Sequence, residues 1–415
     1  MSGTLPDTAT PTDSHGEQPN MMAFLRDGKA RNNAIQAVAL ALVVMLFVSL
    51  ALTTHGNLTE QGITSGFGFL ERTTGWDIPF SLLDYSIRDQ YWRVLLIGFL
   101  NTIFIGLISL LCATLLGTLI GIGRISANPL LRLISTIYVE IFRNIPLILQ
   151  AFFWYAVAIH LPPPRRAIEI GDMVILSSRG IFVPALNVST GAFLTFATVC
   201  VMSTIGVFWW RRRARARGEL ADPVRWLGAL LAGFVVALIA LVVVGVEPGA
   251  PLFEIPKLKG LRFDGGLRLI PEFSALAISI IVFGSAYVGE IVRGGFNAVN
   301  RGQLECARAL GLRPWAVMFH VHVPLALRAI VPPLGNMYVW LMKATTLGIA
   351  IGFSDLFMIV STSINQSGQT IELLILMMTG FFIINYTISA LMNLLNNAIA
   401  LKGYETDVKP VAAEL

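Results

Sequence analysis

Charged residues are scarce in this sequence of 415 amino acids. Asp, Glu, Lys and Arg together make up 13% of the chain, whereas hydrophobic residues make up 55% and the mean hydropathy is +0.71. Soluble globular domains carry about 25% charged residues, so this composition excludes a soluble protein of this size. The chain is therefore expected to be an all-α integral membrane protein.

Cysteine and histidine are also few, and neither is arranged for chemistry. The three cysteines (Cys112, Cys200 and Cys306) have no paired spacing, so neither a disulfide framework nor a metal site is indicated. The five histidines (His15, His55, His160, His320 and His322) lack ligand spacing beside carboxylates. We therefore expect no metal, no cofactor and no catalytic residue.

A phosphate-binding loop is missing as well. The pattern Gly-x-x-x-x-Gly-Lys-Ser/Thr occurs nowhere in the chain. If ATP drives the function of this protein, a separate subunit must bind and hydrolyse it.

Long apolar runs dominate what is present. A helix needs about 20 mostly apolar residues to cross a bilayer. Eight such stretches are predicted, near Ala34 to Thr53, Val94 to Gly123, Leu133 to Leu161, Thr190 to Trp210, Trp226 to Val246, Pro271 to Val292, Ile330 to Ser354 and Glu372 to Ile399. The seventh contains Gly348, Gly352 and Lys343, which favours a broken or re-entrant path.

The distribution of positive charge predicts the orientation. The first span begins only at Ala34, after a tail without apolar periodicity, so we interpret the tail as disordered and not as a cleaved signal. With that tail inside, the inner segments carry 18 Lys and Arg residues and the outer segments carry 10. Both termini are therefore predicted to be cytoplasmic. The run RRRARAR at 211–217 is best explained as a topology anchor, with anionic lipid or nucleic acid binding as the alternative.

One polar segment, ECARALGLRPWAVMFHVHVP at 305–324, interrupts the hydrophobic sequence. The stretch from Arg301 to Leu310 is predicted to be helical, Gly311 suits a left-handed cap, and Pro314 suits the first position of a second helix. Glu305 is spaced to pair with Arg301 or Arg308. The resulting helix–turn–helix lies at the cytoplasmic surface, with apolar residues (Leu304, Ala307, Leu310 and Leu312) available to another protein. An amphipathic interfacial helix is the alternative.

The same segment resembles the EAA loop of the membrane subunits of bacterial ABC importers. The matching positions are Glu305, Cys306, Ala307, Gly311, Val321, Val323 and Pro324, with Cys306 in place of an alanine and valines in place of the usual Ile and Leu. The resemblance implies a type I ABC importer permease fold in the bacterial inner membrane. It also implies that this loop couples the chain to an ATP-binding subunit.

Further stretches resemble the importers of polar amino acids (histidine, glutamate, glutamine, arginine and opines). They are YVEIFRNIPLILQ at 138–150, the segment 285–312, and PPLGNMYVWLMKATTL at 332–347, in which Ala344 stands where Asp is common. The matching core of five helices covers Tyr91 to His160 and Pro271 to Lys402. With its extra spans, the chain is most similar to the larger membrane subunit of general L-amino acid or glutamate/glutamine/aspartate/asparagine importers. That resemblance implies three protein partners: the ATPase, a second related permease and a periplasmic binding protein.

The domain organisation follows from this coverage. We predict a tail (1–33), an extra span and periplasmic loop (34–90), the first core part (91–160), an insertion with two spans (161–270), the second core part (271–402) with its coupling loop (301–324), and a cytoplasmic tail (403–415).

Charged residues at membrane depth are candidates for a substrate path, because burying them is costly unless they have a polar function. The charged candidates are Glu140, Arg143, Glu290, Arg293 and Lys343, and Gln150 and Asn101 are neutral additions. The Glu140–Arg143 and Glu290–Arg293 spacings equally suit ion pairs within one helix. Gly117, Gly121 and Gly123 predict close helix packing, within one chain or at a dimer seam.

Two other functions are alternatives to an ABC importer. A secondary transporter driven by an ion gradient also uses broken helices and buried charges, but it leaves the 305–324 segment unexplained. A membrane enzyme has little support from the residues.

Overall fold

The computed structural model describes residues 28–60, 66–171, 173–186, 253–259 and 262–399, together with scattered residues between 195 and 241. The chain divides into two compact units, 1–66 and 67–415. In the first unit, α2 (Gly28–Glu60) is a single apolar helix that includes the first predicted span. It begins at Gly28, inside the predicted tail. The rest of that tail, the C-terminal tail, most of the two inserted spans and all but Arg213 of the run at 211–217 lie outside the described residues.

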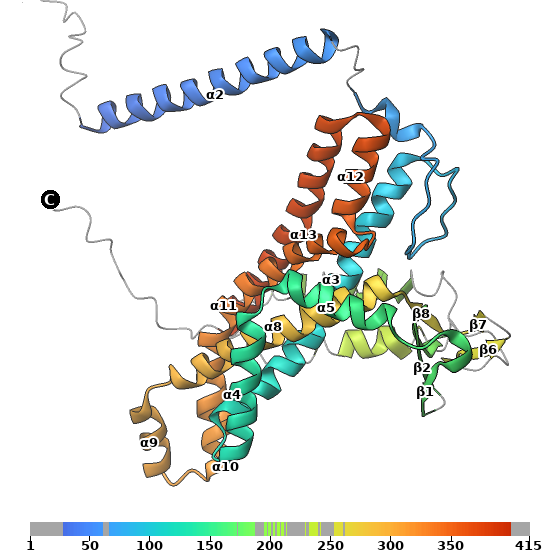
Figure 1. Cartoon of the computed structure of the whole chain (residues 1–415). Coiled ribbons are helices and arrows are strands. Elements are labelled where there is room, and N and C mark those ends of the chain that lie inside the picture. Colours follow the sequence, from blue (N-terminus) through green and yellow to red (C-terminus); the bar gives the residue numbers. More distant parts are fainter. Residues whose placement is uncertain are drawn as a thin grey trace, which may run out of the picture. The chain divides into compact units, whose positions relative to one another are not determined.

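The second unit is a helical bundle whose central member is α8 (Pro271–Asn297) (Figure 1). It packs against α3 (Tyr91–Ile125), α5 (Leu147–Ile159) and α11 (Val323–Ala344). The core between them contains Ile105, Leu276, Ile280 and Leu341. Among the described residues of the whole chain, five helices are long and apolar enough to span a membrane, or six if a bent pair counts as one span. The predicted class of multispan helical protein is therefore confirmed.

Glycines allow α3 and α8 to approach closely. A Cβ atom on Gly117 would lie 2.6 Å from Cβ of Val288, and one on Gly121 would lie 2.8 Å from the carbonyl oxygen of Gly289. Any larger side chain at these two positions would push the helices apart. The predicted small-residue face is thus occupied by α8 of the same chain.

The third predicted span is not one straight helix. α4 (Pro129–Asn144) and α5 meet at an angle of 101°. Pro146 has no N–H to continue the helix, and it favours the extended backbone that Ile145 adopts (φ −90°, ψ 124°). Gln150 completes the break, because its Nε2 donates to the carbonyls of Phe142 (2.9 Å) and Ile145 (3.1 Å). The predicted span from Leu133 to Leu161 therefore corresponds to two helices joined at a sharp bend.

The seventh predicted span is broken, as expected, but only at its far end. α11 continues into the 3-10 helix η4 (Thr345–Ile351), and Gly352 then takes a left-handed conformation with φ +82°. A short helix, α12 (Leu356–Ser367), follows and leads into α13 (Thr370–Ile399). Lys343 lies within the regular part of α11, before the break.

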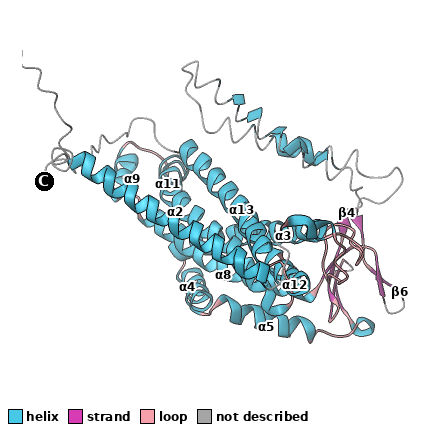
Figure 2. Ribbon diagram, turned by 90° about the horizontal axis from the view of Figure 1, so that it is seen from above, coloured by secondary structure: helices cyan, strands magenta, loops and turns pink. Residues whose placement is uncertain are grey.

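Eight short strands were not predicted. β1 (Ile168–Ile170), β2 (Val174–Ser177), β3 (Gly180–Val183) and β8 (Leu267–Leu269) form an antiparallel sheet in the order β1-β2-β3-β8. Two further pairs join β4 (Ala185–Leu186) to β5 (Phe253–Glu254) and β6 (Lys257–Lys259) to β7 (Arg262–Asp264). These strands lie beside one end of the bundle (Figures 1 and 2). A 3-10 turn, η2 (Pro164–Arg166), precedes them.

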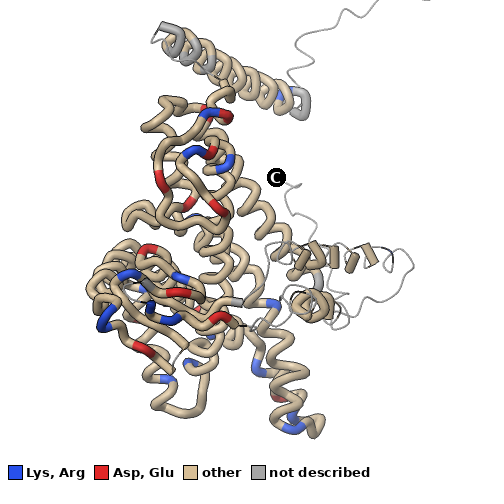
Figure 3. The backbone as a smooth tube through the Cα atoms, turned by 90° about the vertical axis from the view of Figure 1, so that its right-hand side faces the viewer, with Lys and Arg blue, Asp and Glu red and all other residues tan. Residues whose placement is uncertain are grey.

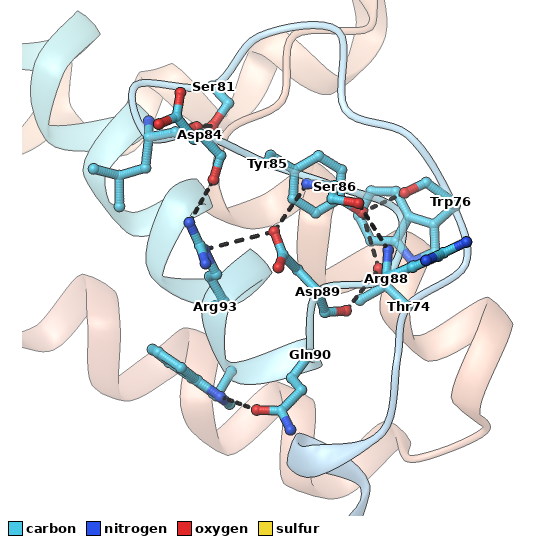
Figure 4. A network of polar contacts seen from close by, with 12 residues as sticks. Thr74, Trp76, Ser81, Asp84, Tyr85, Ser86, Arg88, Asp89, Gln90 and Arg93 are labelled. Atoms are coloured by element: carbon cyan, nitrogen blue, oxygen red, sulfur yellow. Dashed lines mark hydrogen bonds and ion pairs between the residues drawn. The ribbon is translucent and has the colours of Figure 1, made fainter.

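The segment before α3 is a closed loop (Figure 4). It starts with the 3-10 helix η1 (Phe67–Glu71), and a bridge between Thr73 and Gln90 joins its ends. Inside it, the Tyr85 hydroxyl donates to the carbonyl of Trp76, and burial raises the pKa of Tyr85. Asp89 accepts from the Ser86 N–H at 2.8 Å. Charged residues gather in such connecting segments, while the long helices carry few (Figure 3).

The tip of this loop enters the core. The Phe80 ring lies 5.3 Å from Phe273 of α8 and 5.7 Å from Phe353 of the η4–α12 link. The buried Asn101 side chain of α3 donates to the carbonyls of Phe80 (3.0 Å) and Ser354 (2.8 Å). One amide thereby holds three segments together at the end that the charge count predicts to be external.

Candidate functional site

The 301–324 segment folds as a helix–turn–helix at the other end of the bundle. α9 (Arg301–Ala309) begins at Asn300, whose side chain accepts from the Gly302 N–H at 2.9 Å. The helix ends in a turn in which the Leu312 N–H donates to the Ala307 carbonyl (3.3 Å). Gly311 has φ +78°, the left-handed conformation that favours glycine. α10 (Pro314–Val317) then begins with Pro314 at its first position. The local geometry predicted from Gly311 and Pro314 is therefore confirmed.

Large apolar side chains project from this turn. Leu310 is 82% exposed and Trp315 is 73% exposed, and the Trp315 ring stacks on Phe319 with centroids 5.5 Å apart. Cys306, Leu310, Leu312 and Val321 contribute to the lining of a shallow groove beside them. Such a group of exposed apolar side chains is typical of a protein or membrane contact surface. Trp315 and Phe319 were not predicted, although an aromatic pair four residues apart directly after Pro314 is a usable signal.

The predicted coupling residues differ in their exposure to solvent. Glu305, Cys306 and Gly311 are exposed, Ala307 is buried, and the last three (Val321, Val323 and Pro324) are half-buried. Ala307 is buried but also contributes to the lining of the groove beside Leu310, so its contact with a partner stays a prediction. The structure records no ion pair from Glu305 to Arg301 or Arg308, in a segment that it describes throughout.

A π turn, η3 (Met318–His322), joins α10 to α11. It contains one of the few contacts that tie the segment to the bundle. The His322 Nε2 lies 3.1 Å from the carbonyl oxygen of Phe296 near the end of α8, and the two rings meet edge to face at 5.0 Å. π turns recur at functional positions because the extra residue re-aims the helix.

The predicted Glu290–Arg293 pair is present, and it has a third member. Arg293 Nε donates to Glu290 Oε2 at 3.2 Å, and Arg124 of α3 donates through Nη1 to the same oxygen. The Arg124 side chain is 10% exposed. Sequence spacing identified the i,i+3 pair but not Arg124, which is 166 positions away from Glu290.

The other substrate-path candidates are dispersed. Glu140 is exposed and Arg143 is half-buried in the last turns of α4, and no ion pair joins them in this fully described helix. Lys343 is exposed near the end of α11. No recorded contact of the Glu140 or Lys343 side chain reaches the Glu290 cluster, so the described helices do not assemble these groups into one site. Gln150 and Asn101 are buried, and their amide nitrogens bind backbone carbonyls, which gives both residues a structural role.

A bundle of membrane-length helices with an exposed helix–turn–helix at one end is the architecture of a multi-pass membrane protein. Residues 202–401 match the family described as "Binding-protein-dependent transport system inner membrane component". The chain belongs to the family of amino-acid ABC transporter permeases, because three such relatives match it along most of their length.

The relatives are similar in length as well as in sequence. The chain is 40% identical to the "Putative amino-acid ABC transporter permease protein YhdX" of Escherichia coli (88% of this chain, 93% of that protein). It is 37% identical to the "General L-amino acid transport system permease protein AapQ" of Rhizobium johnstonii (94% and 97%). It is 35% identical to the "Glutamate/glutamine/aspartate/asparagine transport system permease protein BztB" of Rhodobacter capsulatus (91% and 96%). The similarity therefore extends over most of the chain and includes much of the region at 161–270.

Proposed function

We propose that this chain is the transmembrane permease subunit of an ATP-driven, binding-protein-dependent importer of L-amino acids. The exposed helix–turn–helix formed by α9 and α10 carries the proposal, because the exposed Leu310 and Trp315 side chains offer an apolar surface to a protein partner. The printed functions of the three relatives support amino acids as the cargo.

The proposed partner at α9 and α10 is a separate ATP-binding subunit. The chain has no phosphate-binding loop of its own, so the energy must be delivered by contact. Leu310, Trp315 and Phe319 supply the apolar area for this contact, and Gly311 sets the angle between the two helices. Closure of the ATPase would move this segment and, with it, the ends of α8 and α11.

The proposed substrates are polar amino acids of broad range, in keeping with the names of two relatives. A periplasmic binding protein would deliver them, and a second, related permease would complete the path in the bacterial inner membrane. An amino acid zwitterion needs an anionic and a cationic partner, which Glu140, Lys343 or the Glu290–Arg293 pair would provide. Unchanged uptake affinity and selectivity in Lys343→Met and Glu140→Gln would remove these residues from the path.

The coupling contact is tested by Gly311→Asp. A side chain at φ +78° strains the turn, and a carboxylate beside Leu310 opposes docking on an apolar surface. We expect the variant to insert normally but to abolish uptake in reconstituted vesicles. Gly171→Asp is the matched control, because Gly171 has φ +60°, equally open surroundings and a position in the β1–β2 turn at the opposite end. Normal uptake by Gly311→Asp contradicts the proposed contact.

A transporter driven by an ion gradient makes a different prediction. Its uptake would persist with vanadate and without a binding protein, and it would collapse with the ion gradient. Vanadate-sensitive uptake that requires a binding protein and an ATPase subunit supports the importer. Substrate-stimulated ATP hydrolysis across the amino acids then defines the substrate range.

A further inference from the structure

Arg124 is the one cation that joins α3 to the charged cluster on α8 in the described contacts. Its Nη1 binds Glu290, its side chain is 10% exposed, and its Nε is buried without a hydrogen-bond partner among the described residues. The guanidinium is therefore committed to Glu290. Removing Glu290 would leave a nearly buried positive charge without a counter-charge.

The last two turns of α8 lead to the 301–324 segment. Glu290 and Arg293 lie three residues apart, and Arg293 Nε donates to Glu290 Oε2 at 3.2 Å. One turn further on, the Phe296 carbonyl oxygen lies 3.1 Å from His322 Nε2. The end of α8 thus contacts α3 through Glu290 and the α10–α11 joint through Phe296.

Elsewhere α3 and α8 meet through apolar packing. It includes Gly117 against Val288, Gly121 against Val292, and the Phe104 and Phe273 rings with centroids 5.6 Å apart. This packing holds the two helices together, but it has no directional hydrogen bond. An ion pair with defined hydrogen bonds specifies a single register, because a shift by one residue would break it.

We propose that Arg124 is a positioning residue for ATP-coupled transport, which makes α3 follow the movement of the α9–α10 segment through Glu290. Movement of α10 displaces His322 and the end of α8, and the Glu290–Arg124 pair carries that displacement to α3. The inference rests on the function proposed above, since it presumes that an ATPase moves α9 and α10. Arg124 itself contacts neither substrate nor nucleotide in this scheme.

The experiment measures uptake and ATP hydrolysis in the same vesicles, containing the complete importer with wild-type chain or Arg124→Met. We expect the number of amino acids imported per ATP to fall at least about fivefold, while binding-protein-stimulated ATP hydrolysis and the melting temperature of the complex stay near wild type. Arg124→Lys keeps the charge with a less rigid geometry and should lose less. Arg132→Met is the matched control, because Arg132 is exposed at the same end and binds the Ser126 carbonyl instead of α8.

Exchanging the charges at positions 124 and 290 is the most direct test of the pair. Arg124→Glu alone should uncouple, because it places a second carboxylate beside Glu290. Arg124→Glu combined with Glu290→Arg should restore part of the ratio, because opposite charges again face each other at positions 124 and 290, whereas Arg293 now repels its neighbour and limits the rescue. An unchanged ratio in Arg124→Met overturns the proposal. So does a parallel loss of uptake and hydrolysis, which would indicate a role in assembly only. If the wild-type complex shows no ATP-dependent uptake, the proposed function fails, whatever Arg124 does.

Discussion

At the residue scale, the buried Asp355 side chain caps a helix and has a raised pKa. It lies in the link after η4, beyond the last residue of the α11–η4 span, and has no exposed surface. Its Oδ1 accepts from the Met358 N–H at 2.8 Å and caps α12, whereas Oδ2 has no partner among the described atoms. Burial raises the pKa of this carboxyl to about 7, opposed only by backbone N–H groups. No ionised side chain contributes to the shift.

This raised pKa predicts a pH-dependent stability. The carboxyl binds its proton more tightly in the folded state, with a pKa of about 7, than in the unfolded state, with 3.8. Stability is therefore lost as the pH rises from about 4 to about 7, and the penalty is constant above that range. Asp355→Asn keeps the cap without the charge, so its melting temperature should exceed that of the wild type at pH 8 by more than at pH 5.5. Thermal unfolding at the two pH values measures this.

Asp264→Asn is the control for that measurement, because Asp264 is exposed and paired with Lys259 at 3.3 Å. Its effect on the melting temperature should be small at both pH values. An Asp355→Asn variant with the same shift at pH 5.5 and pH 8 would show that the carboxyl does not titrate in this interval.

Residues with local partners were predictable from the sequence, and residues with distant partners were not. Gly311 and the Glu290–Arg293 pair follow from spacings of a few residues on one helix. Asn101 and Arg124 find their partners across the bundle, at Ser354 and Glu290. A single sequence contains no signal for such pairs, so Asn101 was placed on a substrate path and Arg124 was not singled out.

At the scale of elements, the α4–α5 break illustrates what hydropathy misses. Apolar residues dominate 133–161, but Glu140, Arg143 and Asn144 lie just before Pro146, where the helix bends. The short strands near both ends of the insertion have two to four residues each, too few for a recognisable alternation. In contrast, the long helices α3, α8 and α13 were predicted because bilayer thickness demands a minimum apolar length.

Gln150→Leu tests the role of this break. Loss of the amide leaves the carbonyls of Phe142 and Ile145 without their donor at a buried site, which costs about 1–3 kcal/mol in unfolding free energy. We expect a lower melting temperature and an unchanged apparent affinity for the amino acid in the protein that remains folded. Thermal unfolding and concentration-dependent uptake measure the two quantities.

Asn144→Ala serves as the comparison, because the Asn144 amide also binds a backbone carbonyl, that of Glu140 at 2.7 Å, but at an exposed position. Its cost should be well below that of Gln150→Leu. A changed affinity with normal stability in Gln150→Leu would instead return Gln150 to the substrate path.

At the scale of the whole molecule, the two ends of the bundle carry different structural elements. One end carries the exposed apolar turn of α9 and α10, and the other carries the strands and the closed loop before α3 (Figure 1). The charge count predicts that the first end is cytoplasmic and the second external. At the first end, the Arg328 side chain of α11 also donates to the carbonyl of Ile399 at the end of α13.

Cysteine labelling checks this orientation. Cys306 is exposed in α9, and a cysteine introduced by Lys259→Cys would be exposed in β6. In a background with Cys112→Ala and Cys200→Ala, a membrane-impermeant maleimide should label position 259 in intact spheroplasts. It should label Cys306 only after the membrane is opened. Labelling of Cys306 from outside would reverse the predicted topology.

The pairing of β3 with β8 has a consequence for the order in which the chain is completed. Ile181 and Val183 pair with Leu269 and Leu267, so the ribosome must add roughly eighty further residues before β3 meets its partner. Until then one edge of β3 has unpaired amides, open to association with other nascent chains. The β3–β8 pair can therefore form only after the segment between the two strands has been synthesised.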